Sequence, residues 1–142
     1  MDYTPAQEKA IHDRPNGNIL VSASAGSGKT RVLVDRIIDM VVTDGVDIDR
    51  LLVVTFTKAA AKEMRDRLQT SLQKKFNQET DTRKKTKLLE QIRKVPVADI
   101  TTMDAYCQKL VSRYYYLLGM DPNFRVLSDT TEAGLLRDQV WE

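Results

Sequence analysis

The feature that most constrains this chain is a glycine-containing turn at residues 23–30, with the sequence Ala-Ser-Ala-Gly-Ser-Gly-Lys-Thr. It follows a short apolar run at residues 18–23, and it precedes a helical pattern that starts at Lys29 and ends at Asp44-Gly45. Glycines permit backbone angles that turn successive N–H groups toward phosphate oxygens, and a helix N-terminus favours an anion. Strand, turn and helix in this order therefore predict a phosphate-binding loop.

The turn differs from the usual G-x-x-x-x-G-K-[ST] motif in having Ala23 at the first glycine position. Its context still predicts nucleotide binding, with ATP and Mg²⁺ as the expected cofactors. Lys29 would place a point charge on the β and γ phosphates, and the Thr30 hydroxyl would coordinate Mg²⁺, so both are candidate catalytic residues. A glycine turn that binds nothing is the alternative. The cofactor-binding candidates within the turn are Ser24, Ala25, Gly26, Ser27, Gly28, Lys29 and Thr30.

Apolar runs and helical spacings predict an α/β fold with a parallel sheet flanked by helices. Residues 51–56 form a continuous apolar run without alternation, as expected for a central strand covered on both faces. Apolar residues then repeat every four positions from Ala60 to Phe76, which predicts a long amphipathic helix. Further strands are expected at residues 18–23, 97–102 and 124–127, and further helices at 103–118 and from a capping-box-like start at Asp129 to Glu142.

Charge is distributed unevenly along the chain. The 142 residues have a net charge of +2, but residues 58–94 hold 12 Lys/Arg and 5 Asp/Glu, a net +7. Such a segment suits an anionic partner, or else a solvated helix and loop. Within it, residues 77–94 contain few apolar side chains, so we expect a solvated connection there with at most a short helix, the least ordered part of the chain.

Composition excludes several classes of protein. The single Cys107 and the single His12 cannot form a disulfide framework or a zinc cluster, and Cys107 is expected in the core on the apolar face of its helix. No apolar stretch approaches the roughly 20 residues of a membrane span, and the N-terminus lacks the features of a signal peptide. We therefore expect a cytoplasmic protein with no membrane partner.

Four blocks in chain order resemble the first four conserved blocks of superfamily 1 DNA helicases of the UvrD, Rep and PcrA type. They are residues 4–11 (T-P-A-Q-E-K-A-I), the turn at 23–30, residues 54–68 (V-T-F-T-K-A-A-A-K-E-M-R-D-R-L) and residues 100–107 (I-T-T-M-D-A-Y-C). Within that group, residues 22–28, 114–118 and 121–125 resemble the AddA (RexA) family of helicase-nuclease subunits. The resemblance implies that residues 1–128 are the N-terminal part of a first RecA-like P-loop motor domain, and that residues 129–142 begin a helical insertion.

The resemblance also implies roles for residues near the nucleotide. Gln7 corresponds to the glutamine that reads adenine, and its carboxamide can both donate and accept along an adenine edge. A surface glutamine in an N-terminal helix is the alternative. Arg31 would approach the nucleotide, or else lie exposed on its helix.

Contact with single-stranded DNA is implied for Thr55, Phe56, Thr57, Lys58, Thr102 and Tyr106. These residues lie at or just beyond the carboxyl ends of two predicted strands, where open parallel sheets form binding sites. Phe56 would stack on a base, with core packing as the alternative. Lys58 and Lys62 would contact phosphates or simply face water. Asp104 stands where relatives commonly carry His, and its carboxylate would repel a phosphate, so it is assigned no contact.

Parts of a complete motor are missing from the sequence. It has no Asp-Glu dipeptide to hold Mg²⁺ and orient water, and its last helical pattern runs to the final residue. We therefore expect an N-terminal fragment that binds nucleotide weakly without turning it over. The hypothesis for the full protein is an ATP-dependent, 3′-to-5′ DNA helicase/exonuclease subunit that unwinds and resects duplex DNA ends in recombinational double-strand break repair, with an AddB (RexB) partner. A small P-loop phosphotransferase and a non-enzymatic single-stranded DNA-binding module are the alternatives.

Overall fold

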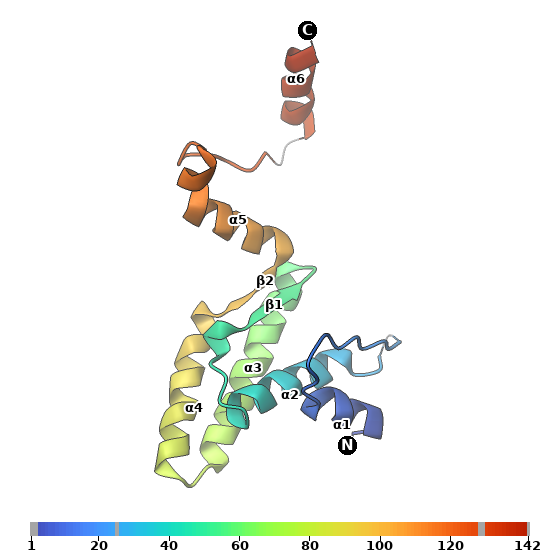
Figure 1. Cartoon of the computed structure of the whole chain (residues 1–142), viewed down its shortest axis with the longest axis vertical. Coiled ribbons are helices and arrows are strands. Elements are labelled where there is room, and N and C mark those ends of the chain that lie inside the picture. Colours follow the sequence, from blue (N-terminus) through green and yellow to red (C-terminus); the bar gives the residue numbers. More distant parts are fainter. Residues whose placement is uncertain (1–2, 25, 128–129, 142) are drawn as a thin grey trace. The chain divides into compact units, whose positions relative to one another are not determined.

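The computed structural model describes residues 3–24, 26–127 and 130–141 (Figure 1). The chain forms two compact units, Met1–Tyr106 and Cys107–Glu142. The helices are α1 (Pro5–His12), α2 (Lys29–Val42), α3 (Lys58–Gln78), α4 (Thr82–Lys94), α5 (Met103–Tyr114) and α6 (Thr130–Trp141), and the strands are β1 (Leu52–Thr55) and β2 (Asp99–Thr102). Short 3₁₀ turns occupy Ile48–Arg50, Val95–Val97 and Tyr115–Leu118. The predicted domain boundary between residues 128 and 129 falls outside the described residues and stays a prediction.

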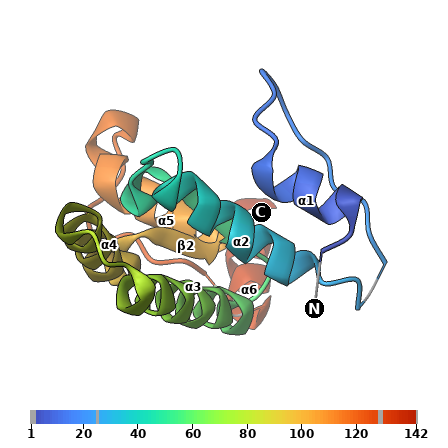
Figure 2. The same cartoon turned by 90° about the horizontal axis from the view of Figure 1, so that it is seen from below.

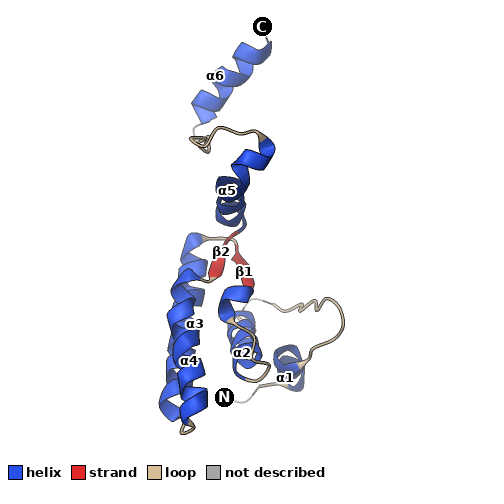
Figure 3. Ribbon diagram, turned by 60° about the vertical axis from the view of Figure 1, so that its left-hand side comes forward, coloured by secondary structure: helices blue, strands red, loops and turns tan. Residues whose placement is uncertain are grey.

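The sheet of the first unit consists of two parallel strands. β1 and β2 pair in register from Leu52 opposite Asp99 to Thr55 opposite Thr102. The connection between them runs through α3 and α4, which lie side by side (Figure 3). Parallel neighbours need a crossover of this kind, because a tight hairpin can join only antiparallel strands. The predicted α/β class with a parallel sheet is confirmed.

The hydrophobic core of the first unit lies between the sheet, α2, α3 and α4. Its buried side chains are Val34, Ile37, Ile38, Val41, Ile48, Val53, Met64, Leu68, Leu72, Leu88, Val95, Ala98 and Ile100. The long amphipathic helix is confirmed, since α3 contributes residues at the predicted four-residue spacing. In β1, however, only Val53 is buried, while Leu52 and Val54 are 47% and 38% exposed. The prediction that this strand is covered on both faces is wrong for the described residues, because helices cover only the face that carries Val53.

Helix α4 replaces the solvated connection predicted for residues 77–94. Asp81 begins the helix, and its side chain accepts hydrogen bonds from two backbone N–H groups of the first turn. Leu88 and Gln91 are buried on the face that packs on α3 and the 3₁₀ turns. The prediction was wrong because one narrow stripe is enough to hold a helix against its neighbours, even when every other face is charged.

Two predicted strands are not found in the described structure. Residues 18–23 form an exposed connection between α1 and α2, and Leu20 in its middle is 95% exposed. Residues 124–127 are also irregular. Backbone groups of a strand need a paired neighbour, and neither segment joins the β1–β2 sheet. Both strand predictions are therefore wrong.

The second unit contains most of α5, a 3₁₀ turn and α6. Gly119 ends the 3₁₀ turn with a φ of +63°, the left-handed conformation typical of a C-cap, so the predicted stop is confirmed. Helix α6 is also confirmed, although its predicted cap Asp129 lies outside the described residues. Arg125 forms an ion pair with Glu132 at the start of α6. Cys107 is exposed, so the prediction that it lies in the core is wrong.

Candidate nucleotide-binding turn and DNA-contact edge

The N-terminus of α2 differs from those of the neighbouring helices. Helices α1, α3 and α4 each begin with a side chain that accepts a hydrogen bond from the first turn, namely Thr4, Thr57 and Asp81. Helix α2 begins at Gly28, with no side-chain cap and no acidic residue in its first turn. Its first N–H groups and the positive end of its dipole are therefore left for an external anion.

The turn before α2 has a backbone geometry that favours glycine. Gly26 and Gly28 have φ angles of +77° and +80°, both in the left-handed region. A Cβ built on Gly26 would meet no atom within 4 Å, so this position faces open space. These residues fit a phosphate chain, because N–H groups in such a turn can point at one anion. Ala25, also predicted here, lies outside the described residues.

Lys29 closes the turn with its own side chain. Its Nζ donates hydrogen bonds to the carbonyl oxygens of Ala23 at 2.7 Å and Ser24 at 2.6 Å. The Ser27 hydroxyl also donates to the Ser24 carbonyl, at 2.7 Å. A phosphate oxygen is a stronger acceptor for an ammonium group than a neutral carbonyl. The amine is thus held at the mouth of the turn by groups that a phosphate could replace, beside the exposed Thr30 in the first turn of α2.

Gln7 reaches the same turn from α1. Its Nε2 donates to the Ser27 carbonyl at 3.1 Å, and its Oε1 accepts from the Thr4 backbone N–H at 2.9 Å. The second contact completes a capping box, which fixes the end of the carboxamide that faces the turn. One N–H and one lone pair of the carboxamide remain for a ligand. The structure therefore brings Gln7 to the predicted turn.

Arg31 lies beside Tyr3, a residue that sequence reasoning missed. The Arg31 guanidinium is 4.4 Å from the centre of the Tyr3 ring, and its Nε donates to the Tyr3 hydroxyl at 2.9 Å. That hydroxyl donates in turn to Asp35. Burial raises the pKa of the Asp35 carboxyl, although nearby Lys75 opposes the effect. These contacts join the residues before α1 to α2, and no local pattern around a lone tyrosine could have revealed them.

The predicted DNA-contacting residues gather at the carboxyl end of the sheet. Thr55 and Thr102 are paired neighbours at the last positions of β1 and β2. Phe56 follows β1 directly, and its exposed fraction of 103% is incompatible with core packing in this structure. Since binding sites of parallel sheets form at this edge, the structure brings the two predicted blocks together in a suitable place.

The remaining candidates at this edge differ in accessibility. The Thr57 hydroxyl caps α3, and the Thr55 hydroxyl donates to the Thr57 carbonyl at 3.0 Å. Thr102 is only 8% exposed, and its hydroxyl accepts from a backbone N–H at the start of α5. Lys58 is exposed and Tyr106 is half-buried. The edge therefore presents an aromatic ring and an ammonium group most openly, while Thr102 is the least accessible candidate.

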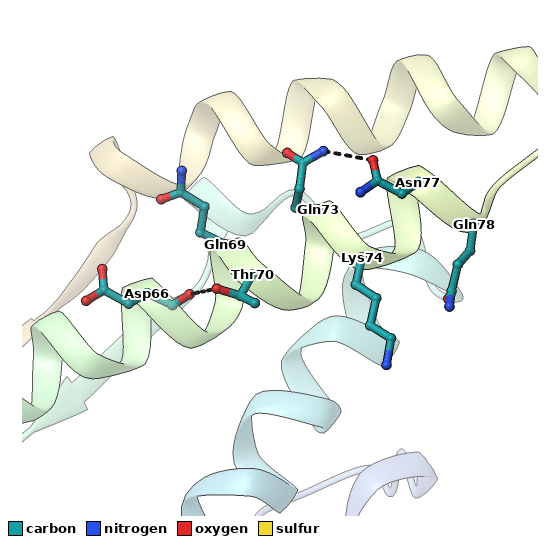
Figure 4. Close-up of a pocket in the computed structure, with 7 residues that line it drawn as sticks. All are labelled: Asp66, Gln69, Thr70, Gln73, Lys74, Asn77 and Gln78. Carbon is teal, nitrogen blue, oxygen red and sulfur yellow. Dashed lines mark hydrogen bonds between the residues drawn. The ribbon is translucent and has the colours of Figure 1, made fainter.

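A polar groove of about 740 Å³ runs along α3 and was not predicted from the sequence (Figure 4). The residues that line it are Asp66, Gln69, Thr70, Gln73, Lys74, Asn77 and Gln78. Gln73 donates to Asn77 at 3.2 Å, and the Thr70 hydroxyl donates to the Asp66 carbonyl at 2.8 Å. Because these side chains belong to one helix and partly satisfy one another, we assign no site to the groove.

Two searches over the described residues gave negative results. No three His, Cys, Asp or Glu side chains in residues 3–24, 26–127 and 130–141 are grouped so that they could hold a metal ion. Within the same ranges, no helix combines the length and the apolar character needed to cross a membrane.

Comparison with known proteins defines the class. Residues 3–141 match the family model described as the UvrD/REP helicase N-terminal domain. The chain therefore belongs to this family, as its four sequence blocks indicated, and the match gives no support to the small phosphotransferase alternative.

The curated relatives are more specific, and each is named as the AddA-type subunit of an ATP-dependent helicase/nuclease. The chain is 56% identical over 140 residues to the protein of Levilactobacillus brevis, and 51% identical over 140 residues to those of Ligilactobacillus salivarius and Enterococcus faecalis. These matches cover 98% or 99% of this chain but 11% of each relative. The predicted similarity to the AddA group is confirmed, and the chain spans about a tenth of the length of these relatives.

Proposed function

We propose that the chain is the ATP-binding, N-terminal portion of an ATP-dependent DNA helicase/exonuclease subunit. The full protein unwinds and resects duplex DNA ends in recombinational double-strand break repair, together with an AddB-type partner subunit, in the cytoplasm where bacterial DNA lies. The observation that carries the proposal is the uncapped N-terminus of α2 behind a left-handed glycine turn, in a chain of the UvrD/REP family. In this proposal the α/β unit is the first part of a RecA-like motor domain, and residues 129–142 begin a helical insertion.

ATP binds at α2 and the turn before it. The backbone of residues 24–28 accepts the phosphates through its N–H groups, and Lys29 moves from the two turn carbonyls to the β and γ phosphates. Bound Mg²⁺ neutralises charge on the phosphates, and the Thr30 hydroxyl is its ligand in this chain. Arg31 supports the site from the first turn of α2. Gln7 donates to adenine N7 and accepts from the adenine amino group, a pairing that guanine does not offer.

Single-stranded DNA binds along the carboxyl edge of the sheet. Phe56 stacks on a base, since its ring is fully exposed at the end of β1. Thr55, Thr57, Lys58, Thr102 and Tyr106 contact the backbone of the same strand. The exposure of Phe56 and Lys58 supports this placement most directly. The nuclease and the second motor domain belong to parts of the full protein beyond this segment.

The test is Lys29→Ala in the full-length protein with its partner subunit. We expect DNA-stimulated ATP hydrolysis to fall at least about a hundredfold, the usual cost of removing one donor that stabilises transition-state charge. Lys87→Ala is the matched control, because it removes an exposed lysine of α4 far from the turn in sequence. Retained hydrolysis in Lys29→Ala would contradict the proposal. In the isolated 142-residue segment we expect nucleotide binding without multiple turnover.

A further inference from the structure

Helix α1 lies outside the hydrophobic core of the first unit. It has eight residues, of which only Ile11 is buried, and the core cluster contains no residue of α1. An isolated helix of this length is not stable in water. Helix α1 packs beside α2 (Figure 2), so the polar contacts between the two helices must supply much of what holds it in place.

Arg14, two residues beyond α1, forms the densest set of these contacts. Its Nη2 lies 2.7 Å from Asp39 Oδ2, and its Nε lies 2.6 Å from Asp44 Oδ2. Its Nη1 donates to the Ile11 carbonyl at 2.7 Å, which satisfies one of the free carbonyls at the end of α1. One guanidinium therefore ties the end of α1 to the last turns of α2 and to the turn that follows.

Other contacts fix the same helix from both ends. Arg36 of α2 donates to the Ala10 carbonyl at 2.6 Å, and His12 Nδ1 lies 3.2 Å from the Asp39 carboxylate. Tyr3 and Asp35 join the other end of α1 to α2. Helix α1 is thus held as a short rigid rod on α2, and Gln7 is carried on this rod.

The Asp39 carboxylate is the centre of the anchor. Burial alone would raise its pKa, but hydrogen bonds from Thr43, His12 and Arg14 outweigh burial and hold the pKa below the ordinary value. Asp39 therefore stays ionised at neutral pH and keeps Arg14 paired.

We infer that Arg14 is a positioning residue for base selection: by anchoring α1 on Asp39 and Asp44, it holds the Gln7 carboxamide at the turn and sets the preference for adenine over guanine. This inference rests on the proposed function, in which Gln7 binds the base. Adenine presents one donor and one acceptor to the free groups of Gln7, whereas guanine presents two acceptors. A hydrogen bond tolerates only a few tenths of an ångström in distance. A released α1 therefore loses discrimination between bases, while the phosphate contacts of residues 24–30 persist.

The experiment measures hydrolysis of ATP and GTP by the full-length protein, with inorganic tripolyphosphate as a competing inhibitor. In Arg14→Ala, we expect the ratio of kcat/KM for ATP to that for GTP to fall about tenfold, which is the order of discrimination that one bidentate base contact supplies. KM for ATP rises, while kcat and the inhibition by tripolyphosphate stay unchanged. Arg14→Lys gives an intermediate ratio, because an ammonium group keeps the charge but cannot bridge two carboxylates as a guanidinium does.

Lys9→Ala is the matched control, since Lys9 lies on the same helix with its side chain 79% exposed and outside the anchor. Its ATP-to-GTP ratio should equal that of the unmodified protein. The inference is overturned if the unmodified protein has no base preference, if Arg14→Ala keeps its preference, or if Arg14→Ala loses tripolyphosphate inhibition together with ATP. Hydrolysis that survives Lys29→Ala would instead refute the proposed function, so the two failures are distinguishable.

Discussion

Gln7 serves α1 and the glycine turn at the same time. Its Oε1 completes the capping box with Thr4, and its Nε2 donates to the Ser27 carbonyl. A glutamate at this position also completes a capping box, because that contact requires only an acceptor. A glutamate has no N–H donor, however. One substitution can therefore separate the structural role of this residue from its proposed role in binding adenine.

In Gln7→Glu, we expect amide hydrogen exchange of α1 to stay unchanged and KM for ATP to rise at least about tenfold, because the donor to adenine N7 is lost. Peptide-level exchange and steady-state kinetics of the full-length protein measure both quantities. Gln69→Glu, on an exposed position of α3, introduces the same charge and should leave both unchanged. An unaltered KM in Gln7→Glu would show that the carboxamide does not contact the base.

Prediction from the sequence succeeded for residues whose signal is local. The glycine turn could be placed because its motif, the apolar run before it and the helix after it are contiguous. Arg14 carried no such signal, since it meets Asp39 and Asp44 at separations of 25 and 30 residues. Asp44 could be interpreted only as the end of a helix. Contacts of this kind exist only after the helices have packed.

At the scale of elements, Gln91 joins α4 to the 3₁₀ turn before β1. Its Oε1 accepts from the Ile48 backbone N–H at 2.9 Å, and its Nε2 donates to Asp47 at 2.6 Å. Gln91 is 7% exposed and Ile48 is fully buried. The amide side chain therefore satisfies a backbone donor that has no access to water.

Replacement of this amide leaves the Ile48 N–H buried without its acceptor, so Gln91→Ala should lower the free energy of opening of α4 by about 1–3 kcal/mol. Amide hydrogen exchange of the helix measures this quantity. Gln73→Ala is the control, because Gln73 is exposed on α3 and donates to Asn77 (Figure 4); its effect should stay within about 0.5 kcal/mol. Equal effects of the two substitutions would refute the role of Gln91.

The elements that could not be predicted depend on partners distant in sequence. α4 was missed because a narrow stripe around Leu88 is a weak periodic signal, and its stability comes from packing on α3 and the 3₁₀ turns. Residues 18–23 were predicted as a strand because they are apolar, but a strand also needs a paired neighbour, which sequence patterns do not specify. By contrast, the spacing within α2 and α3 is local, and both helices were predicted correctly.

At the scale of the whole molecule, the first unit carries both the glycine turn and the DNA-contact edge. Helix α2 begins at the turn, and α3 begins directly after the sheet edge. The two helices share one core, in which Val34 and Ile37 are buried together with Met64 and Leu68. Close-packed cores resist deformation, so the two proposed sites are held by one rigid framework. A side chain outside that core can be removed from one site without disturbing the other.

Phe56 is such a side chain, because it is fully exposed beyond β1. In Phe56→Ala of the full-length protein, we expect the concentration of single-stranded DNA that half-maximally stimulates ATP hydrolysis to rise about tenfold, since stacking on one base contributes about 1–3 kcal/mol. Hydrolysis without DNA should be unchanged, because the turn keeps its framework. Val97→Ala removes another exposed apolar side chain, before β2 at the amino end of the sheet, and should have no effect. An unchanged DNA requirement in Phe56→Ala would exclude base stacking at this position, whereas a loss of DNA-independent hydrolysis would show that the two sites are coupled through Phe56.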